Sequence, residues 1–362
     1  MPTKVLHVIG SLRLGGAQVV LKHIVENSSK DFEHIVYPLR PKDPMFDLDA
    51  TVIQRNWPNY DPRKFFEIIR LVNQENIDIL AVHLTKPIMG GLLASRFCDA
   101  KVVVHEHGPL VRKGLQYSFY RFMLKRLWKR ASAFIAVSNN MRDELINIAG
   151  VDPAMITVVP NAVDLDEFDP EKTDPKKTRD AFQVQPTDIV IGYAGRLASV
   201  KGVDVLLKAA AKLPDKFKLV LAGSGSQENN LKQLAKDLSI TDSVKFMGFC
   251  DDITNTISGF DIGVIPSRQE SFGIVGIEMM RMNVPVISTG VDGMADYMID
   301  GQNAIIFGVD NPDQLAQSIQ KLASDDQLRH TLKENAAKTA QNFSIQKCVT
   351  AIEKIYTDIQ ND

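Results

Sequence analysis

The stretch IGVIPSRQESFGIVGIE, residues 262–278, joins an apolar run to a polar segment and then to a helical pattern. The run at 262–265 is typical of a buried strand in a parallel sheet, and a helix starting near Gly273 would follow it. Such a helix would point its unsatisfied N–H groups at a phosphate, with Glu270 just before its first turn and Glu278 more than one turn inside. We therefore expect a ligand site at this turn.

Apolar runs and amphipathic helical patterns alternate along the rest of the chain. Strand, helix and strand in succession predict parallel sheets, so the expected fold class is α/β. The alternation stops near 158–161 and resumes near Asp188. The predicted strands are Val5–Ile9, His34–Tyr37, Ile77–Val82, Val102–Val104, Phe134–Val137, Ile189–Tyr193, Leu219–Leu221, Val244–Phe246, Ile262–Ile265 and Val284–Ile287.

This break in the pattern predicts two Rossmann-like domains. The N-terminal domain would span 1–165 and the C-terminal domain 166–343, with a loop-rich linker over 160–186. Residues 344–362 would form a last helix that could pack back on the N-terminal domain. Because parallel α/β units bind ligands at the carboxyl ends of their strands, two such domains facing each other would share a cleft.

Composition limits the function classes. The chain has 362 residues, 44% hydrophobic and 24% charged, which fits two globular domains. A net charge of −2 and a pI near 6.4 lack the basic surplus of a general nucleic-acid binder, so we expect no nucleic-acid partner. Cys98, Cys250 and Cys348 have neither disulfide-framework nor metal-ligand spacing. They are typical of a reducing compartment, and we expect a cytoplasmic protein.

Any membrane contact should be peripheral. The first apolar run, Val5–Ile9, is too short for the core of a signal peptide. No stretch approaches the roughly 18 apolar residues of a spanning helix, so contact would be at the inner face of the cell membrane.

A basic segment over 112–130 is the candidate for such contact, because it has seven cations and no carboxylate. Leu115, Phe119 and Phe122 recur in it at helical spacing, which is consistent with a core helix that has a solvated face. The alternative is attraction to an anionic leaflet or to a lipid-diphosphate acceptor. The cations are Arg112, Lys113, Arg121, Lys125, Arg126, Lys129 and Arg130.

Two other strand-to-helix turns have residues suited to phosphate. Gly15 and Gly16 precede a helix that should start near Ala17, and glycines let the backbone approach a ligand closely, although such a pair is also common for structural reasons. The spacing is not that of the dinucleotide motif, so a dehydrogenase is disfavoured. After the strand at 189–194, Gly195 and the cations that follow it form the second turn.

Those cations are Arg196 and Lys201, at a strand end and a helix start. The helix dipole disfavours cations at this position. They are either solvated surface residues or a clamp for a diphosphate, with Arg196 acting through its planar fork and Lys201 as a point charge.

Two patterns could bind a metal. His105 and His107 lie two apart in an extended segment and so share a face, but no third ligand is evident nearby. The sequences at 47–49 and 164–166 match an Asp-x-Asp metal motif, yet neither has an adjacent apolar strand to aim it. The two cations above could neutralise a leaving group instead. We expect no metal and no other cofactor.

Several short motifs follow one another in a specific order: Gly15-Gly16-Ala17, His107-Gly108, Ala136-Val137-Ser138, Pro160–Asp164, Gly195-Arg196, Lys201-Gly202, Gly223-Ser224-Gly225, Pro266-Ser267, Glu270 with Glu278, and Pro285-Val286-Ile287. In these motifs nearly the whole chain resembles the family 4 glycosyltransferases of the GT-B fold. The resemblance implies a retaining enzyme of hexosyltransferase type. It would move a sugar from a nucleotide-sugar, with a UDP-sugar favoured, to a hydroxyl acceptor such as a lipid-linked glycan or a surface polysaccharide.

The resemblance also implies residue roles. His107, Arg196, Lys201 and Glu270 would be catalytic, with the two cations on the diphosphate, and Glu278 would bind the ribose. The donor would bind mainly to 166–343 and the acceptor to 1–165. Two alternatives stay open, a sugar-nucleotide epimerase and a non-catalytic subunit of a transferase complex. The other implied donor-binding residues are Gly15, Gly16, Gly195, Ser271, Phe272, Gly273, Ile274 and Val275.

Overall fold

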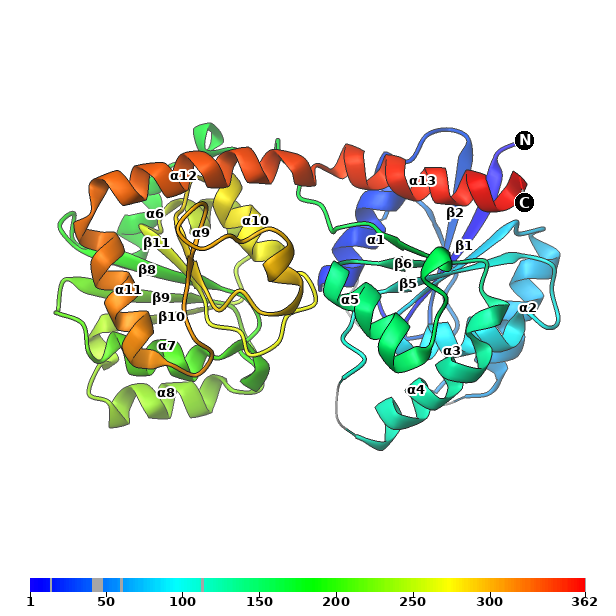
Figure 1. Ribbon diagram of the computed structural model, residues 1–362, viewed down its shortest axis with the longest axis horizontal. Helices are drawn as coiled ribbons and strands as arrows, with labels where there is room; N and C mark the ends of the chain where they lie inside the picture. The colour runs from blue at the N-terminus through cyan, green and yellow to red at the C-terminus, as the bar shows by residue number, and fades with distance from the viewer. Residues whose placement is uncertain (14, 41–47, 59–60, 112–113, 362) are drawn as a thin grey trace. The chain divides into compact units, whose positions relative to one another are not determined.

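The computed structural model describes residues 1–361 apart from 14, 41–47, 59–60 and 112–113, and it divides into two compact units (Figure 1). Unit 1 comprises Met1–Ala162 together with Ile345–Asp362, and unit 2 comprises Val163–Ser344. The chain therefore passes into unit 2 after Ala162, whereas the sequence pattern suggested 165.

Unit 1 is built on a parallel seven-stranded sheet in the order β3-β2-β1-β4-β5-β6-β7. Successive residues of each strand face opposite sides of the sheet, and both sides are buried. The strands therefore appear in the sequence as continuous apolar runs. The strands are β1 Thr3–Ile9, β2 Phe32–Pro38, β3 Thr51–Val52, β4 Ile79–His83, β5 Lys101–Glu106, β6 Ala133–Ala136 and β7 Ile156–Val158.

Helices cover both faces of this sheet (Figure 1). One face packs against α2, α3, α4 and α5, and the other packs against α1 and the C-terminal helix α13. Cys348, Ile352 and Tyr356 of α13 lie in the same apolar cluster as Val5 and Val103 of the sheet, so the last helix belongs to unit 1. The helices are α1 Gly16–Asn27, α2 Arg63–Gln74, α3 Thr85–Ala94, α4 Leu115–Leu127, α5 Asn139–Glu144 and α13 Ile345–Asn361, with short turns at η1 Trp128–Arg130, η2 Leu145–Ala149 and η3 Pro153–Met155.

Unit 2 has a parallel six-stranded sheet in the order β10-β9-β8-β11-β12-β13. Its strands are β8 Ile189–Ala194, β9 Phe217–Ala222, β10 Val244–Gly248, β11 Ile262–Ile265, β12 Val286–Ser288 and β13 Ile305–Ile306. Its helices are α6 Pro175–Phe182, α7 Val203–Ala210, α8 Glu228–Asp237, α9 Ile253–Ser258, α10 Ile274–Arg281, α11 Pro312–Ser324 and α12 Asp326–Ala340. Short 3-10 turns are η4 Pro170–Lys172, η5 Ser199–Lys201, η6 Thr241–Ser243, η7 Asp292–Asp296 and η8 Gln341–Phe343.

The predicted fold class, two parallel α/β sheets, is confirmed. Each predicted apolar run overlaps a strand, whereas β3, β7 and β13 were missed because each has only two or three residues. The interval 160–186, expected to be loop-rich, contains the helix α6. Asp174 caps it by accepting a hydrogen bond from the Lys177 N–H, and Pro175 stands in its first turn. No helix in the described part of the chain has the length and apolar character needed to span a bilayer.

Candidate functional site

The carboxyl ends of β8 and β9 approach each other closely at two glycines. A Cβ on Gly223 would lie 1.9 Å from the carbonyl oxygen of Gly195, so any side chain there would push the two turns apart. Both glycines have φ in the left-handed range, +148° at Gly195 and +142° at Gly223. The Tyr193 hydroxyl donates to the Arg196 carbonyl oxygen at 2.9 Å and so holds the turn after β8.

Lys201 ends a short 3-10 turn, η5, and α7 begins two residues later at Val203. Gly202 between them has φ +65°, and a Cβ there would lie 1.9 Å from the Pro266 carbonyl oxygen. This close approach brings the turn after β8 against the segment that follows β11. Lys201 is therefore held at the carboxyl edge of the sheet, where parallel α/β folds bind ligands.

Lys201 and Glu270, 69 residues apart in the chain, form an ion pair between Nζ and Oε2. The two side chains are only 21% and 13% exposed, so the pair is largely shielded from water. The Ser267 hydroxyl contributes a second contact to the same carboxylate oxygen at 3.3 Å, and the Glu270 backbone N–H donates to Asp292 Oδ2 at 2.9 Å. The structure thus brings together two of the residues that the sequence suggested for catalysis.

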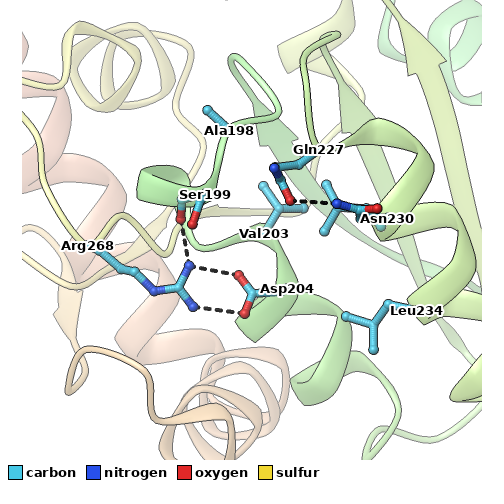
Figure 2. A pocket seen from close by; sticks show the side chains of 9 residues that line it. Ala198, Ser199, Val203, Asp204, Gln227, Asn230, Leu234 and Arg268 are labelled. Carbon is cyan, nitrogen blue, oxygen red and sulfur yellow. Dashed lines mark hydrogen bonds and ion pairs between the residues drawn. The ribbon is translucent and has the colours of Figure 1, made fainter.

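Arg268 fastens the turn that carries Lys201 (Figure 2). Its backbone N–H donates to the Val200 carbonyl oxygen at 2.8 Å, and its guanidinium donates to the Ser199 carbonyl oxygen at 2.6 Å. Two further guanidinium N–H groups bind the Asp204 carboxylate at 2.9 and 2.8 Å, in the planar fork geometry that lysine cannot form. The sequence analysis missed Arg268 and Asp204, because only the tertiary structure places α7 beside the segment after β11.

Arg268 and Asp204 border a pocket of about 290 Å³ in unit 2. Figure 2 shows Arg268 and Asp204 on one side of it and Gln227 with Asn230 on the other. The remaining lining residues are Ala198, Ser199, Val203, Leu231 and Leu234.

The helix α10 begins after Gly273, whose φ of +79° lets the chain turn sharply into it. A buried hydroxyl holds this start, because Tyr297 donates to the Gly273 carbonyl oxygen at 2.6 Å. The backbone of Ser271 is approached equally closely, since a Cβ on Gly293 would lie 2.0 Å from its carbonyl oxygen. Tyr297 was not recognised in the sequence.

The other residues expected around this helix differ in what they can offer a ligand. Phe272 is 1% exposed and packs on Tyr297, so only its backbone could reach a ligand. Ser271, Ile274 and Val275 are partly buried.

Glu278 lies in the fifth position of α10 and is partly buried. Burial, with a smaller contribution from the like charge of Glu167, raises the pKa of Glu278 to about 7. Arg196, at the end of β8, has an exposed side chain, and within the described residues it makes no ion pair. Of these residues, Arg196 is an exposed cation, Lys201 is an ion-paired cation and Glu278 is a carboxyl group that resists ionisation.

Gly15 and Gly16 belong to unit 1, whereas the other residues expected to bind the donor belong to unit 2. Gly15 caps α1, and a Cβ on it would lie 2.8 Å from Gln18 Oε1. Gln18 is buried and donates to the Ser11 carbonyl oxygen at 3.0 Å, which closes the turn between β1 and α1.

His107 follows β5 at the carboxyl edge of the first sheet, and its Nε2 lies 3.1 Å from His83 Nδ1. Burial lowers the pKa of His107 to about 4 and lowers the pKa of His83 well below its usual value, so both rings are neutral. The expectation that no third imidazole lies near His105 and His107 was wrong. Ring nitrogens of His83, His105 and His107 all lie within 4.8 Å of one another, because β4 and β5 are neighbours in the sheet.

The structure describes the two Asp-x-Asp patterns to different extents. Asp47 lies outside the described residues. Asp164 accepts hydrogen bonds from the backbone N–H groups of Asp166 and Glu167, at 2.9 and 3.0 Å, and so closes a turn at the start of unit 2.

The basic segment is only partly a core helix. Tyr120, Leu124 and Leu127 of α4 are buried, but Leu115, Phe119 and Phe122 are 91%, 53% and 49% exposed. A core helix with a solvated face therefore describes only part of α4, because the helix also has a second apolar stripe that faces outward.

The cations of this segment also differ from one another. Arg121 donates to the Leu110 carbonyl oxygen at 2.7 Å and thus holds the preceding loop. Arg126 stacks over Phe122, with its guanidinium carbon 4.4 Å from the ring centre. Lys125 and Lys129 are exposed, and Arg130 borders a separate pocket with Cys98. Arg112 and Lys113 lie outside the described residues.

Sequence relatives cover both units. The family model described as Glycosyltransferase Family 4 matches residues 14–167, and the one described as Glycosyl transferases group 1 matches 174–339. D-inositol 3-phosphate glycosyltransferase 2 of Catenulispora acidiphila is 32% identical over 241 residues, which are 63% of this chain and 56% of that protein. The corresponding protein of Mycobacterium sp. (strain JLS) is 35% identical over 56% of this chain and 46% of its own length. The chain thus spans about half the length of the curated relatives it matches.

Solved structures agree on the fold. Anabaena Alr3699/HepE, crystallised in complex with UDP and glucose, is 22% identical and superposes over 98% of this chain and 100% of its own, with a TM-score of 0.85. Sucrose-phosphate synthase of Thermosynechococcus elongatus superposes over 99% of both chains, at 18% identity and a TM-score of 0.85. With two family models matched in succession over both units, the chain belongs to the family 4 glycosyltransferases of the GT-B fold.

Proposed function

We propose that this protein is a retaining hexosyltransferase that moves a sugar from a nucleotide-sugar to a hydroxyl of a lipid-linked or surface-polysaccharide glycan. The observation that best supports this proposal is the ion pair of Lys201 with Glu270 near the start of α10. A cation, a carboxylate and backbone N–H groups converge there. These three kinds of group match a diphosphate joined to a sugar. The UDP bound by the structurally similar Anabaena protein supports a UDP-sugar as donor.

The residues divide the work of the transfer. Arg196 and Lys201 stabilise the negative charge that develops on the departing diphosphate, helped by the N-terminus of α10. Glu270 orients the sugar hydroxyls, and Glu278 binds the ribose hydroxyls. His107 of unit 1 contacts the donor sugar. The acceptor hydroxyl attacks from the face that the diphosphate leaves, and a phosphate oxygen takes its proton, so the anomeric configuration is retained without a protein nucleophile.

Removing either cation tests this scheme. Arg196→Ala and Lys201→Ala should each lower kcat for UDP-glucose-dependent transfer or hydrolysis by a factor of about 100 to 1,000, the usual effect of losing one such donor. Lys232→Ala is the matched control, because Lys232 is an exposed lysine in the same unit and its ion pair is with Glu228 on its own helix. Near-normal rates in both site variants, with unchanged thermal stability, would refute the clamp.

Two other functions remain to be separated from transfer. A sugar-nucleotide epimerase would convert the donor without any acceptor, so incubation with UDP-glucose alone and analysis of the recovered nucleotide-sugar distinguishes it. A non-catalytic subunit would bind the donor without releasing UDP.

We also propose that α4 docks on an anionic lipid surface. Exposed Leu115, Phe119 and Phe122 provide an apolar stripe, and exposed Lys125 and Lys129 provide charge beside it. An amphipathic helix of this kind inserts its apolar side chains at the headgroup boundary, while each cation near an anionic leaflet contributes about 1 kcal/mol.

Vesicle flotation tests the docking surface with phosphatidylglycerol vesicles and with neutral phosphatidylcholine vesicles. The protein should float with the anionic vesicles at low salt, and the double change Phe119→Ser with Phe122→Ser should weaken this about tenfold or more. Phe66→Ser on α2 is the matched control, because Phe66 is 64% exposed but lies outside the stripe. Absence of flotation at low salt would overturn the proposal.

A further inference from the structure

Four histidines, three on the adjacent strands β2, β1 and β4 and one directly after β5, form one diagonal row across the buried sheet of unit 1. In the register of the parallel strands, His34 lies opposite Val5, two residues before His7. His7 in turn lies opposite Ala81, two residues before His83. The third step repeats the pattern, because His83 lies opposite His105, two residues before His107. Each histidine therefore stands one strand over and two residues nearer the carboxyl edge than the one before it.

The rings are joined in the same way at every step. His34 Nδ1 lies 2.9 Å from His7 Nε2, and His7 Nδ1 lies 3.0 Å from His83 Nε2. His83 Nδ1 lies 3.1 Å from His107 Nε2. All three distances are those of N–H···N hydrogen bonds, and each link uses Nδ1 of one ring and Nε2 of the next.

Neutral imidazoles linked in this order have coupled tautomers. A neutral ring has one N–H donor and one acceptor nitrogen, and each link needs one of each. If one ring has its proton on Nδ1, then every ring must have it there, and the same holds for Nε2. Any mixed arrangement places two N–H groups or two lone pairs against each other. Burial lowers the pKa of all four rings, to about 4 for His34 and His107 and well below the usual value for His7 and His83, which keeps them neutral.

Each end of the row has a buried nitrogen that lacks a hydrogen-bond partner among the described residues. These nitrogens are His34 Nε2 and His107 Nδ1. Buried polar atoms are normally paired, so an unpaired nitrogen at the carboxyl edge of a parallel sheet points to a ligand group. In the all-Nδ1–H state His107 presents a donor there, and in the all-Nε2–H state it presents an acceptor.

We propose that His34, His7, His83 and His107 act as one tautomeric unit that decides whether His107 Nδ1 donates a hydrogen bond to a substrate hydroxyl or accepts one from it. In this unit His83 is the positioning residue, because it alone links His107 to the rest of the row. The inference rests on the proposed function for the role of His107, but the coupling of the rings does not depend on that function. A sugar hydroxyl can donate or accept, so its binding selects one state of the row. A change from the all-Nδ1–H to the all-Nε2–H state moves one proton across each of the three links, takes up one proton from water at His34 Nε2 and releases one to water from His107 Nδ1.

A metal site is the competing explanation for part of this cluster. Ring nitrogens of His83, His105 and His107 lie close enough to share an ion. However, the facing nitrogens of His83 and His107 already pair with each other, and His105 Nε2 pairs with the Tyr356 hydroxyl at 3.0 Å. Hydrogen bonding therefore accounts for these contacts without an ion.

Histidine ¹⁵N chemical shifts distinguish the two neutral tautomers and the metal-bound ring, so they test the row in the free protein. We expect one common tautomer for all four rings. Opposite tautomers in adjacent rings would overturn the proposal. So would a joint shift of His83, His105 and His107 on addition of one equivalent of Zn²⁺, whereas unchanged spectra support it.

Variants of His34 test the coupling at a distance. His34 is three rings away from His107 and is only partly buried. His34→Phe removes the first link, and the tautomer ratio of His107 should change about threefold or more, the effect of one hydrogen bond. His34→Asn is the control, because its amide can replace Nδ1, and it should keep the ratio. An unchanged ratio in a folded His34→Phe protein would overturn the proposal.

Variants of His83 connect the row to turnover. The amide of His83→Asn can replace Nδ1 and keep the bond to His107, whereas that of His83→Gln can replace Nε2 and lose it. With UDP-glucose, kcat should fall about tenfold in His83→Gln and less than about threefold in His83→Asn. Equal losses would overturn the positioning role. If the rings are coupled but the protein transfers no sugar, the proposed function fails and the tautomeric unit stands.

Discussion

Replacing Glu278 by glutamine should stabilise the free protein at high pH while weakening donor binding. The pKa of Glu278 is raised to about 7 by burial, with a smaller effect of Glu167, from an ordinary value of 4.5. Between pH 4.5 and about 7 the carboxyl group is therefore mostly protonated in the folded state and mostly ionised in the unfolded state. The side chain is partly buried inside the fold, so water screens this penalty only in part.

The sign and size follow from linkage. A folded-state pKa above the unfolded value means that the folded state binds the proton more tightly, so this contribution to stability is present below pH 4.5 and is lost as pH rises through about 7. A pKa difference of this size between the folded and unfolded states lowers the free energy of unfolding by at most about 3 kcal/mol above pH 7. For a domain of this length that is at most about 6 to 12 °C in Tm.

Thermal denaturation at pH 5 and pH 8 measures the effect. Glu278→Gln should exceed the wild type in Tm at pH 8 and nearly match it at pH 5, while Glu171→Gln, a control at an exposed position in unit 2, should change neither value. Titration with UDP should then raise the Tm of the variant less than that of the wild type, because an amide offers a ribose diol fewer acceptor sites than a carboxylate. A variant that is less stable at both pH values would refute the reasoning.

Three further changes probe how the turns are held. Gly202→Ala should destabilise unit 2 by about 3 kcal/mol, because its Cβ would lie 1.9 Å from the Pro266 carbonyl oxygen. The control Gly301→Ala, at φ +69° with open space around it, should cost only about 1 kcal/mol. Equal losses of the two variants in urea unfolding would contradict this. Arg268→Ala should lower kcat about tenfold by releasing the turn that carries Lys201, and rescue by Arg268→Lys would show that the fork is unimportant. Tyr297→Phe should lose about 1 to 2 kcal/mol in thermal denaturation, because the buried Gly273 carbonyl loses its donor, and an unchanged Tm would exclude that role.

The parts of the fold that could be predicted are those that depend on local pattern. Buried strands of a parallel sheet read as continuous apolar runs, so the longer strands were found, while two-residue strands such as β13 have no pattern to detect. The start of α10 was also predictable, because Gly273 directly follows the polar segment after β11. The helix α6 was missed although Asp174 and Pro175 are a regular start signal, since the charged composition of the interval suggested a loop.

The candidate site depended on contacts that no local pattern contains. The ion pair of Lys201 with Glu270 spans 69 residues, and the bond from Arg268 to Asp204 spans 64. Both exist because β8 and β11 are neighbours in the sheet, although two strands of unit 2 separate them in the sequence. Individual residues could be nominated from the sequence, but their partners could not.

The histidine row shows how strongly such partners depend on strand order and register. The four histidines, His34, His7, His83 and His107, are scattered over the first 107 residues. Only the strand order β2-β1-β4-β5 places them on or directly after neighbouring strands. Successive residues of a strand face opposite sides of a sheet, so a shift of one residue in any one register would turn a histidine to the other face and break the row. Three registers must therefore agree at once. Burying the row costs desolvation at each ring, so its rings must be hydrogen-bonded to one another. Among the described residues, that leaves the terminal nitrogens of His34 and His107 as the two places where a ligand can act on all four rings.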